Sequence, residues 1–395
     1  MATKVYPHSI AHIFLKLGNV AIRVDTNPDI GMGHLRRCLT LAKQLHSDGF
    51  VVQLICRSFC NKNVEKLVKD FNVVFLNQSE IIYDYSDPQS QELWDAETTL
   101  SIIGHYPNYI SWVIVDSYQL GELWEKTISQ AGHKILAIDD FRNRRHYADL
   151  LLSDTSISFS KEMNGNENSF YELVGSKFAL IDSEYAFIQD SSISLVTPKR
   201  ILISYGGCDP TDETTKALEA IYLLRNHKRY QECFGIVDVV VGQVNPKADM
   251  VIRSAGEIDN VKVHLAPSSL ACFLRRTDIF LTSGGNSMVE ALTMRKPCLV
   301  TVTTENQALM VNQLVEKSAI IALGDHVQVS SELIANALIE ICTKYEQIAT
   351  KFISQSIFDH LGASRVSSMM QSMSQDRANF FKFENMAKIN EKSSY

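Results

Sequence analysis

The 395-residue sequence lacks an apolar run of the roughly 20 residues that a membrane-spanning helix requires. It also has no excess of positive charge, because 38 Lys and Arg stand against 45 Asp and Glu, a formal net charge of −7. Nucleic acids and anionic membranes bind dense cationic surfaces, so neither is expected as the main partner. Residues 1–19 lack the small-residue cleavage site of a signal peptide, and we therefore expect a cytoplasmic protein.

Several metal-binding and catalytic motifs are missing as well. The eight cysteines are scattered through apolar segments, and the closest pair, Cys56 and Cys60, has no second pair or histidine at zinc spacing. The sequence shows no Walker loop, Asp-x-Asp metal motif, Gly-x-Ser-x-Gly elbow or paired glycosidase carboxylates. We therefore expect reduced, buried thiols, no metal, no cofactor, and a substrate that carries its own good leaving group, such as a nucleoside diphosphate.

The sequence does contain two series of short, nearly continuous apolar strands that alternate with helical periodicity. The expected strands are residues 20–25, 50–56, 73–76, 112–117, 134–140 and 150–154, then 200–207, 237–243, 261–266, 278–285, 298–302 and 319–324. Such strands are typical of parallel sheets covered on both faces, which predicts an α/β protein with two Rossmann-like, doubly wound domains.

The expected organisation along the chain follows from these two series. It consists of an N-terminal extension (1–19), a first domain (20–187), a connection (188–199), a second domain (200–370) and a tail (371–395). Ligands of open parallel sheets bind beyond the carboxyl ends of the strands. The cleft between the two domains is therefore the expected site.

The first strand runs into a turn that begins at Asp25 and carries Gly31, Gly33 and His34. The turn does not fit a dinucleotide-binding loop, because Arg36 occupies the position of the third glycine and no acidic residue ends the second strand. His34 should lie at a helix N-terminus, where the positive end of the helix dipole disfavours the imidazolium form. A neutral imidazole can act as a general base, although His34 could instead only cap the helix or pack against the turn.

Polar residues also follow the fourth and fifth strands. Asp116 and Tyr118 follow the fourth strand, and Asp139 and Asp140 follow the fifth. Tyr118 offers a ring face and a phenolic donor, which suits contact with a sugar. For Asp139 and Asp140, capping of the next helix and ligand binding are equal alternatives.

Two glycine pairs follow strands of the second series. Gly206-Gly207 precedes an acidic helix start, and Ser283-Gly284-Gly285-Asn286-Ser287 precedes another helix. Backbone amides at such a helix start can bind phosphate oxygens. Glu290 lies one turn into the second of these helices, where it either accepts hydrogen bonds from ribose hydroxyls or forms a capping box.

Together these segments resemble a family of GT-B-like enzymes, the UDP-2,4-diacetamido-2,4,6-trideoxy-β-L-altropyranose hydrolases of pseudaminic acid biosynthesis, which are related to spore-coat polysaccharide proteins. The resemblance covers roughly residues 20–370. The similar stretches are Asp25 to Cys38, VIVDSY (113–118), LAIDD (136–140), ILISYGGCDP (201–210), DIFLTSGGNSMVEA (278–291), Asn306-Gln307 and FDHLGASRV (358–366).

The resemblance implies that His34 is the base for a metal-independent attack of water on the anomeric carbon, with inversion and release of UDP. It places the sugar on the first domain and UDP on the second. The implied sugar-side residues are Asp25, Gly31, Gly33, Arg37, Asp116 and Tyr118. The implied UDP-side residues are Gly206, Gly207, Gly284, Gly285, Asn286, Ser287, Glu290, Asn306 and Gln307.

Two other functions stay open on the same scaffold. A GT-B glycosyltransferase would place an acceptor hydroxyl where the hydrolase places water, and it would build a surface polysaccharide or a glycan such as that of flagellin. A nucleotide-sugar-binding protein without enzymatic activity is the third alternative. We expect a monomer or a weak homo-oligomer.

Overall fold

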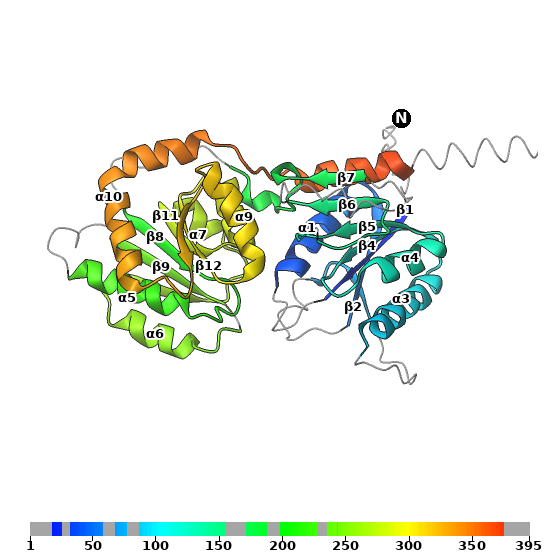
Figure 1. Ribbon diagram of the computed structural model, residues 1–395, viewed down its shortest axis with the longest axis horizontal. Helices are drawn as coiled ribbons and strands as arrows, with labels where there is room; N and C mark the ends of the chain where they lie inside the picture. Colours follow the sequence, from blue (N-terminus) through cyan, green and yellow to red (C-terminus); the bar gives the residue numbers. More distant parts are fainter. Residues whose placement is uncertain are drawn as a thin grey trace, which may run out of the picture.

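The computed structural model describes residues 18–25, 32–57, 68–76, 87–141, 143–154, 171–187, 198–226, 235–242 and 244–374. Two parallel β-sheets, each flanked by helices, form two lobes that lie side by side (Figure 1). The predicted two-domain α/β architecture is confirmed, with a strand at every expected position. Among the described residues, no helix has the length and apolar character needed to cross a membrane.

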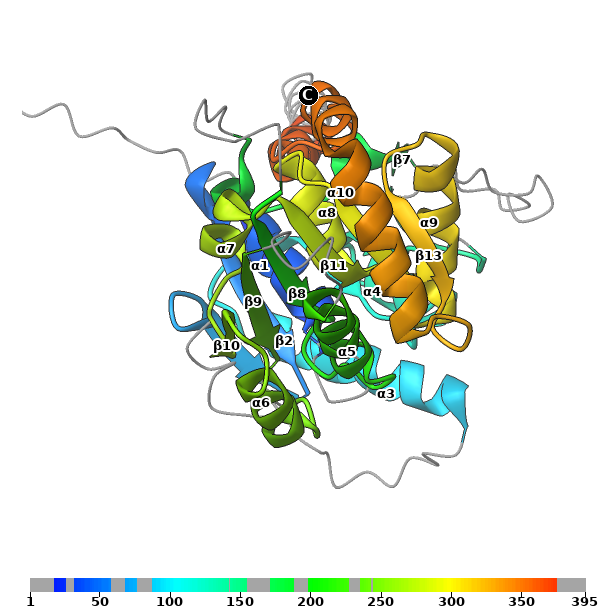
Figure 2. The same ribbon diagram turned by 90° about the vertical axis from the view of Figure 1, so that its left-hand side faces the viewer.

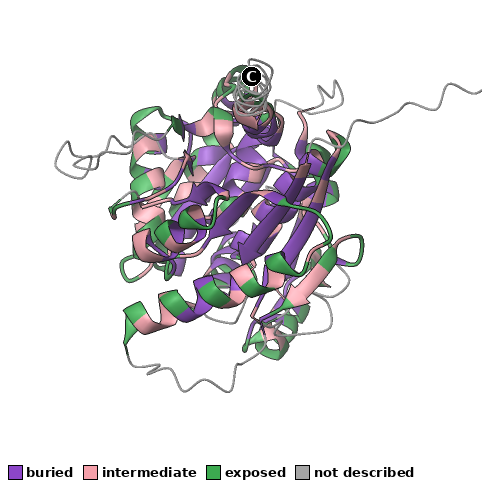
Figure 3. Cartoon of the chain, turned by 90° about the vertical axis from the view of Figure 1, so that its right-hand side faces the viewer, coloured by how far each residue is buried: buried purple, intermediate pink, exposed green. Residues whose placement is uncertain are grey.

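The first sheet has seven strands in the order β3-β2-β1-β4-β5-β6-β7, and all its neighbouring strands pair in parallel. The strands are β1 (Gly18–Val24), β2 (Phe50–Cys56), β3 (Asn72–Phe75), β4 (Ile110–Asp116), β5 (Lys134–Ile138), β6 (Leu150–Ser153) and β7 (Tyr171–Val174). The central strands are buried on both faces (Figure 3). Only β7 had no sequence signal, because it is a short edge strand in which a single residue, Leu173, is buried.

Helices cover both faces of this sheet. Helix α1 (Gly33–Ser47) packs on one face, and its buried residues Leu35, Cys38 and Leu45 repeat at helical spacing. Helices α3 (Pro88–Gly104) and α4 (Glu122–Gln130) cover the other face, where Trp94 and Trp124 are buried. Helix α1 therefore begins directly beyond the carboxyl end of β1.

The second sheet has six parallel strands in the order β10-β9-β8-β11-β12-β13 (Figure 2). The strands are β8 (Arg200–Ser204), β9 (Ile236–Val241), β10 (Val261–Leu265), β11 (Ile279–Ser283), β12 (Cys298–Val302) and β13 (Ile321–Asp325). Helices α5 (Glu213–Arg225), α6 (Ala248–Gly256) and α10 (Ser331–Ser354) pack on one face, and α7 (Ala271–Arg276), α8 (Asn286–Thr293) and α9 (Glu305–Glu316) on the other.

The chain crosses between the lobes twice in the described residues, and the two crossings touch. On the way out, Ala179 and Ile181 pack into the core of the second lobe. On the way back, helix 362–374 packs on the first lobe, where Val366 and Met370 are fully buried beside α1 (Figure 1). Gly362 lies at the return crossing, and a Cβ there would overlap the carbonyl oxygen of Ala179. The expected boundary at residue 370 thus falls within a helix of the first lobe, while most of the expected connection, 188–197, lies outside the described residues.

We expect the returning helix to stabilise the first lobe. The substitution Met370→Ala removes a fully buried side chain and should lower the free energy of unfolding of that lobe by about 2–5 kcal/mol. All three tryptophans, Trp94, Trp112 and Trp124, lie in the first lobe, so their fluorescence during urea unfolding reports on that lobe alone. Ser372→Ala, at an exposed position of the same helix, is the control. An unchanged tryptophan transition in Met370→Ala would show that the helix contributes nothing.

Candidate functional site

The first lobe presents a row of aspartates at the carboxyl ends of three adjacent strands. Asp116 is the last residue of β4, Asp140 lies two residues beyond β5, and Asp154 directly follows β6. Because β4, β5 and β6 are neighbours in the sheet, the three side chains emerge at the same edge. This edge faces the second lobe.

Arg37 in the first turns of α1 ties two of these aspartates together. Its Nε and Nη2 donate hydrogen bonds to the two carboxylate oxygens of Asp116, both at 2.6 Å. Its Nη1 donates to both oxygens of Asp140, at 2.7 and 2.9 Å. Such a two-pronged contact fixes both position and orientation of the carboxylate. Arg37 therefore anchors the start of α1 to the ends of β4 and β5.

His34 lies against the same carboxylate. Its Nδ1 is 2.5 Å from Asp116 Oδ1, and the ring is buried. Arg37 Nη2 is also 3.1 Å from this nitrogen, but Arg37 can only donate and it already bonds Asp116. A carboxylate can only accept, so Nδ1 carries the hydrogen of this bond, and in the neutral ring Nε2 keeps its lone pair. This is the tautomer that a general base requires.

The charges around Asp116 keep it ionised. Burial by itself raises the pKa of this carboxyl, but Arg37 and His34 together bring the pKa well below its usual range. The ring of Tyr118 packs edge-on against His34 at a centroid distance of 4.7 Å. Burial and the adjacent Asp140, which accepts a 2.9 Å bond from the Tyr118 hydroxyl, raise the pKa of Tyr118.

The second lobe brings the glycine turn after β11 to the opposite side of the cleft. Helix α8 begins there at Asn286, with Gly285 as its N-cap residue. Gly284 packs so closely on α9 that a Cβ would come within 2.5 Å of Val311. Its amide donates to Gln307 Oε1 at 3.0 Å, and the same oxygen accepts from the Thr303 amide. Gln307 thus holds the ends of β11 and β12 together, and the Gly284 amide is already engaged.

Polar contacts join the two lobes across the cleft. Asn286 Nδ2 donates to the carbonyl oxygen of Gly33 at 3.2 Å. The side chain of Asn306 lies near Tyr118 and by itself lowers the pKa of the Tyr118 hydroxyl. Arg36 Nη1 donates to the Ser268 carbonyl oxygen at 3.3 Å. The loops that sequence analysis assigns to sugar and to UDP therefore meet directly.

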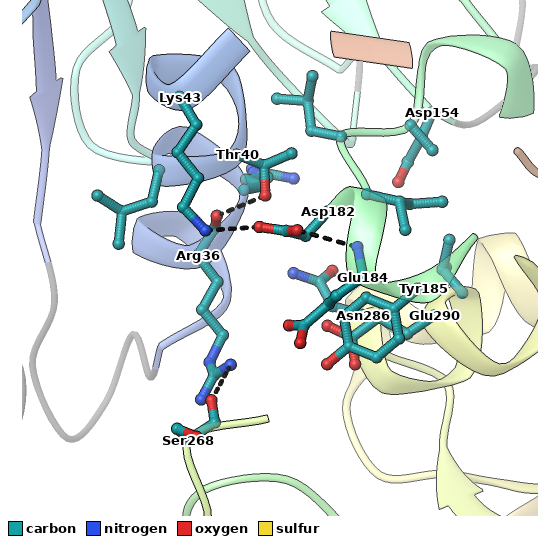
Figure 4. Close-up of a pocket in the computed structure, with 16 residues that line it drawn as sticks. Arg36, Thr40, Lys43, Asp154, Asp182, Glu184, Tyr185, Ser268, Asn286 and Glu290 are labelled. Atoms are coloured by element: carbon teal, nitrogen blue, oxygen red, sulfur yellow. Dashed lines mark hydrogen bonds and ion pairs between the residues drawn. The ribbon is translucent and has the colours of Figure 1, made fainter. Parts of the chain in front are cut away.

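A pocket lies beside these contacts, between α1, the end of β6, residues 179–185 and α8 (Figure 4). Of the predicted site residues, it contains Arg37, Asn286 and Glu290. Burial raises the pKa of Glu290 to about 7, against the opposing effects of Arg36 and of a hydrogen bond with Tyr185. Eight polar residues of the pocket wall were not predicted as site residues. They are Arg36, Thr40, Lys43, Asp154, Asp182, Glu184, Tyr185 and Ser268.

Other predicted residues are engaged elsewhere or fall outside this group. Asp25 accepts hydrogen bonds from the fully buried Arg23 and from the Arg57 amide, so its oxygens serve the interior of the first lobe. The Gly206-Gly207 turn packs against the backbone of Gly242, where a Cβ would collide. Ser287 is half-buried in the first turn of α8, and Gly31 lies outside the described residues.

The two aspartates after β5, Asp139 and Asp140, have different hydrogen-bond partners. Asp140 binds Arg37 and Tyr118 and so belongs to the site. Asp139 is buried and accepts from the Phe141 amide and from His146 Nε2, the latter at 2.9 Å. The other ring nitrogen of His146 is 2.8 Å from Glu125 Oε1. This buried network supports the loop after β4, because Arg144, bonded to Asp139, also donates to the Ser117 and Tyr118 carbonyl oxygens.

Comparison with solved structures shows the class of fold. The chain superposes on Staphylococcus aureus MnaA in a structure with UDP (TM-score 0.60, 15% identity, 90% of this chain and 96% of the other). It is similarly close to Acinetobacter baumannii MurG (TM-score 0.59, 13% identity, 90% and 99%). A third likeness is to the UDP-GlcNAc 2-epimerase of Neisseria meningitidis bound to UDP-GlcNAc (TM-score 0.59, 13% identity, 90% and 100%). The two lobes therefore form a GT-B-like fold.

Comparison of sequences narrows the relationship. The chain is 24% identical over 299 residues to the UDP-2,4-diacetamido-2,4,6-trideoxy-β-L-altropyranose hydrolase of Campylobacter jejuni, covering 75% of this chain and 96% of that protein. It is 22% identical over 260 residues to the spore coat polysaccharide biosynthesis protein SpsG of Bacillus subtilis, covering 64% and 73%. The chain is thus a distant relative of both proteins.

A longer archaeal protein is also similar. The chain is 26% identical over 297 residues to the uncharacterized protein MJ1062 of Methanocaldococcus jannaschii, covering 73% of this chain. It spans only 56% of the length of MJ1062. No protein-family model matches the chain.

The buried histidine network makes the stability of the first lobe depend on pH. Burial lowers the pKa of His146, but bonds and charges of Asp139 and Glu125 raise it from 6.5 to about 9. Because the folded-state pKa is the higher one, the stabilisation is complete below about pH 6.5 and is lost as pH rises through about 9. Its size is on the order of 3 kcal/mol.

This dependence can be measured with His146→Gln. The difference in unfolding free energy between the parent and the variant, followed by tryptophan fluorescence, should shrink steadily between pH 6.5 and pH 9.5. The control is His133→Gln, whose ring contacts the Ile110 carbonyl oxygen instead of two carboxylates. A His146→Gln difference that stays constant over this range would contradict a buried imidazolium.

Proposed function

We propose that the protein hydrolyses a UDP-linked 2,4-diacetamido-2,4,6-trideoxy sugar to UDP and the free sugar, with inversion at the anomeric carbon. The observation that carries this proposal is the contact between His34 and Asp116, at the cleft edge of the first lobe. The distant relationship to the Campylobacter jejuni hydrolase supports the choice of substrate. The corresponding role in the cell is a step of pseudaminic acid biosynthesis.

The chemistry follows from the tautomer of His34. Asp116 accepts a hydrogen bond from the Nδ1–H group, which leaves Nε2 with its lone pair. Nε2 takes a proton from water as the water oxygen bonds to the anomeric carbon. The bond between that carbon and the diphosphate oxygen breaks at the same time, and its electron pair leaves with UDP. The imidazolium that forms is stabilised by the negative charge of Asp116. Because the base and the leaving group lie on opposite faces of the sugar, the configuration inverts.

The second lobe offers the groups for the leaving UDP. The start of α8 presents amides that have no partner within the helix, which favours an anion there. The side chain of Asn286 also lies at this start. Glu290 lines the pocket one turn further along α8, where it can accept hydrogen bonds from ribose hydroxyls. Division of the two tasks between the lobes predicts that base and nucleotide site can be disabled separately.

We expect opposite phenotypes from substitutions in the two lobes. His34→Ala should lower kcat by at least about 100-fold, the usual contribution of a general base, and leave the Kd of UDP within about twofold. Glu290→Ala should weaken UDP binding by about 5- to 30-fold, the equivalent of 1–2 kcal/mol for lost hydrogen bonds. Steady-state kinetics and calorimetry with UDP measure both. A His34→Ala variant that keeps most of its kcat would remove the proposed mechanism.

Transfer to an acceptor is the second candidate, because the same base could deprotonate a hydroxyl group in place of water. The relationship to SpsG, a polysaccharide biosynthesis protein, favours it. Release of UDP from the UDP-diacetamido sugar, followed by NMR, distinguishes the two reactions. We expect UDP and free sugar without any acceptor, at a rate that EDTA does not change. Release that requires an acceptor, or a loss with EDTA that Mg²⁺ restores, would instead indicate a transferase.

A further inference from the structure

Asp154 is a pocket residue that the proposed mechanism does not use. It directly follows β6 and lines the pocket between the lobes (Figure 4). Its Oδ1 is buried and has no hydrogen-bond partner among the residues that the structure describes. Native proteins rarely leave a buried carboxyl oxygen unsatisfied, and where they do, a ligand is one of the groups that can fill the place.

Among the residues that the structure describes, the neighbours of Asp154 compensate its charge only in part. Asp116, Asp140 and Asp154 form a row at the ends of β4, β5 and β6, and Arg37 is the guanidinium at this row. The Nε and Nη2 atoms of Arg37 are bonded to Asp116, and its Nη1 is bonded to Asp140. Burial and the charge of Asp140 raise the pKa of Asp154 to about 7. The third carboxyl of the row thus keeps spare hydrogen-bonding capacity beside the pocket that Asp154 lines.

The charge of the row decides which part of a nucleotide sugar can lie there. A diphosphate carries negative charge and is repelled by three carboxyls that share one guanidinium. The opposite wall, where α8 begins, suits that anion. An uncharged sugar brings hydroxyl and amide N–H donors, which match an unsatisfied carboxyl oxygen. Asp154 is also on the lobe that carries His34, next to the strand end that positions Asp140.

We propose that Asp154 binds the glycosyl group of the substrate, with its free oxygen accepting a hydrogen bond from an O–H or N–H of the sugar. It is a residue for binding and specificity, and the base remains His34. This inference rests on the proposed use of a UDP-sugar, but not on whether water or an acceptor attacks it.

The test compares two affinities in a variant whose turnover is strongly reduced. In a His34→Ala background, calorimetry gives the Kd of UDP and the Kd of the intact UDP-diacetamido sugar. Their ratio is the gain in affinity that the sugar provides. We expect Asp154→Leu to reduce this ratio by about tenfold and to leave the Kd of UDP within about twofold. Asp154→Asn keeps an acceptor oxygen and should restore part of the ratio.

Thermal stability separates ligand binding from a structural role. Because the free oxygen is buried without a partner, Asp154→Leu should melt at the same temperature as its parent or higher when no ligand is present. The matched control is Asp238→Leu, a buried aspartate of the second lobe whose Oδ1 does bind protein partners, His264 and Arg276, while its Oδ2 has no hydrogen-bond partner among the described residues. The control should melt lower and keep the ratio unchanged.

The outcomes also distinguish the inference from the proposed function. If Asp154→Leu does not change the ratio of the two Kd values, Asp154 does not bind the sugar, but the proposed UDP-sugar function stands. A lower melting temperature together with equal weakening of UDP and UDP-sugar also overturns it, since that pattern indicates a structural residue. If the parent binds the UDP-sugar no more tightly than UDP, both the inference and the proposed substrate are wrong.

Discussion

The buried ion pair between Arg37 and Asp116 is the interaction on which the rest of the site depends. It joins the start of α1 to the end of β4, and both side chains are almost entirely removed from water. Removing one partner of such a pair leaves an uncompensated charge, which is why pairs of this kind hold a fixed geometry. Because Arg37 holds Asp116 in place, the bond from His34 Nδ1 to Asp116 also fixes the orientation of the imidazole ring. Asp140 accepts hydrogen bonds from both Arg37 and Tyr118, so the position of Tyr118 also depends on Arg37.

One contact between the lobes lies directly beside His34. Asn286 belongs to the start of α8, yet it donates to the Gly33 carbonyl beside His34. The start of α8 therefore lies against the residue that precedes His34. Gly33 allows this approach because it has no side chain. A Cβ at this position would make a tight contact, 3.3 Å from the side-chain nitrogen of Asn286. The glycine before the histidine thus allows the close approach of the two lobes.

Much of the fold could be predicted from local patterns, because buried parallel strands are continuous apolar runs. His34, Asp116 and Tyr118 were also predicted from the sequence, and the structure brings their side chains together, while their role stays a prediction. Asp25 shows where this reasoning fails: it too follows a strand, but Arg23, buried inside that strand, binds it. An arginine in an otherwise apolar strand is a signal for a buried acidic partner. Asp154 could not be singled out, because its importance comes from the order of β4, β5 and β6 in the sheet.

The protonation state of the His34 ring is the central claim, and nitrogen-15 NMR of the imidazole in the UDP-bound protein tests it most directly. The geometry predicts that Nδ1 carries the hydrogen bonded to Asp116 and that the lone pair of Nε2 is available to take a proton. Signals from a ring protonated on Nε2, or on both nitrogens, would contradict the assignment of His34 as the base.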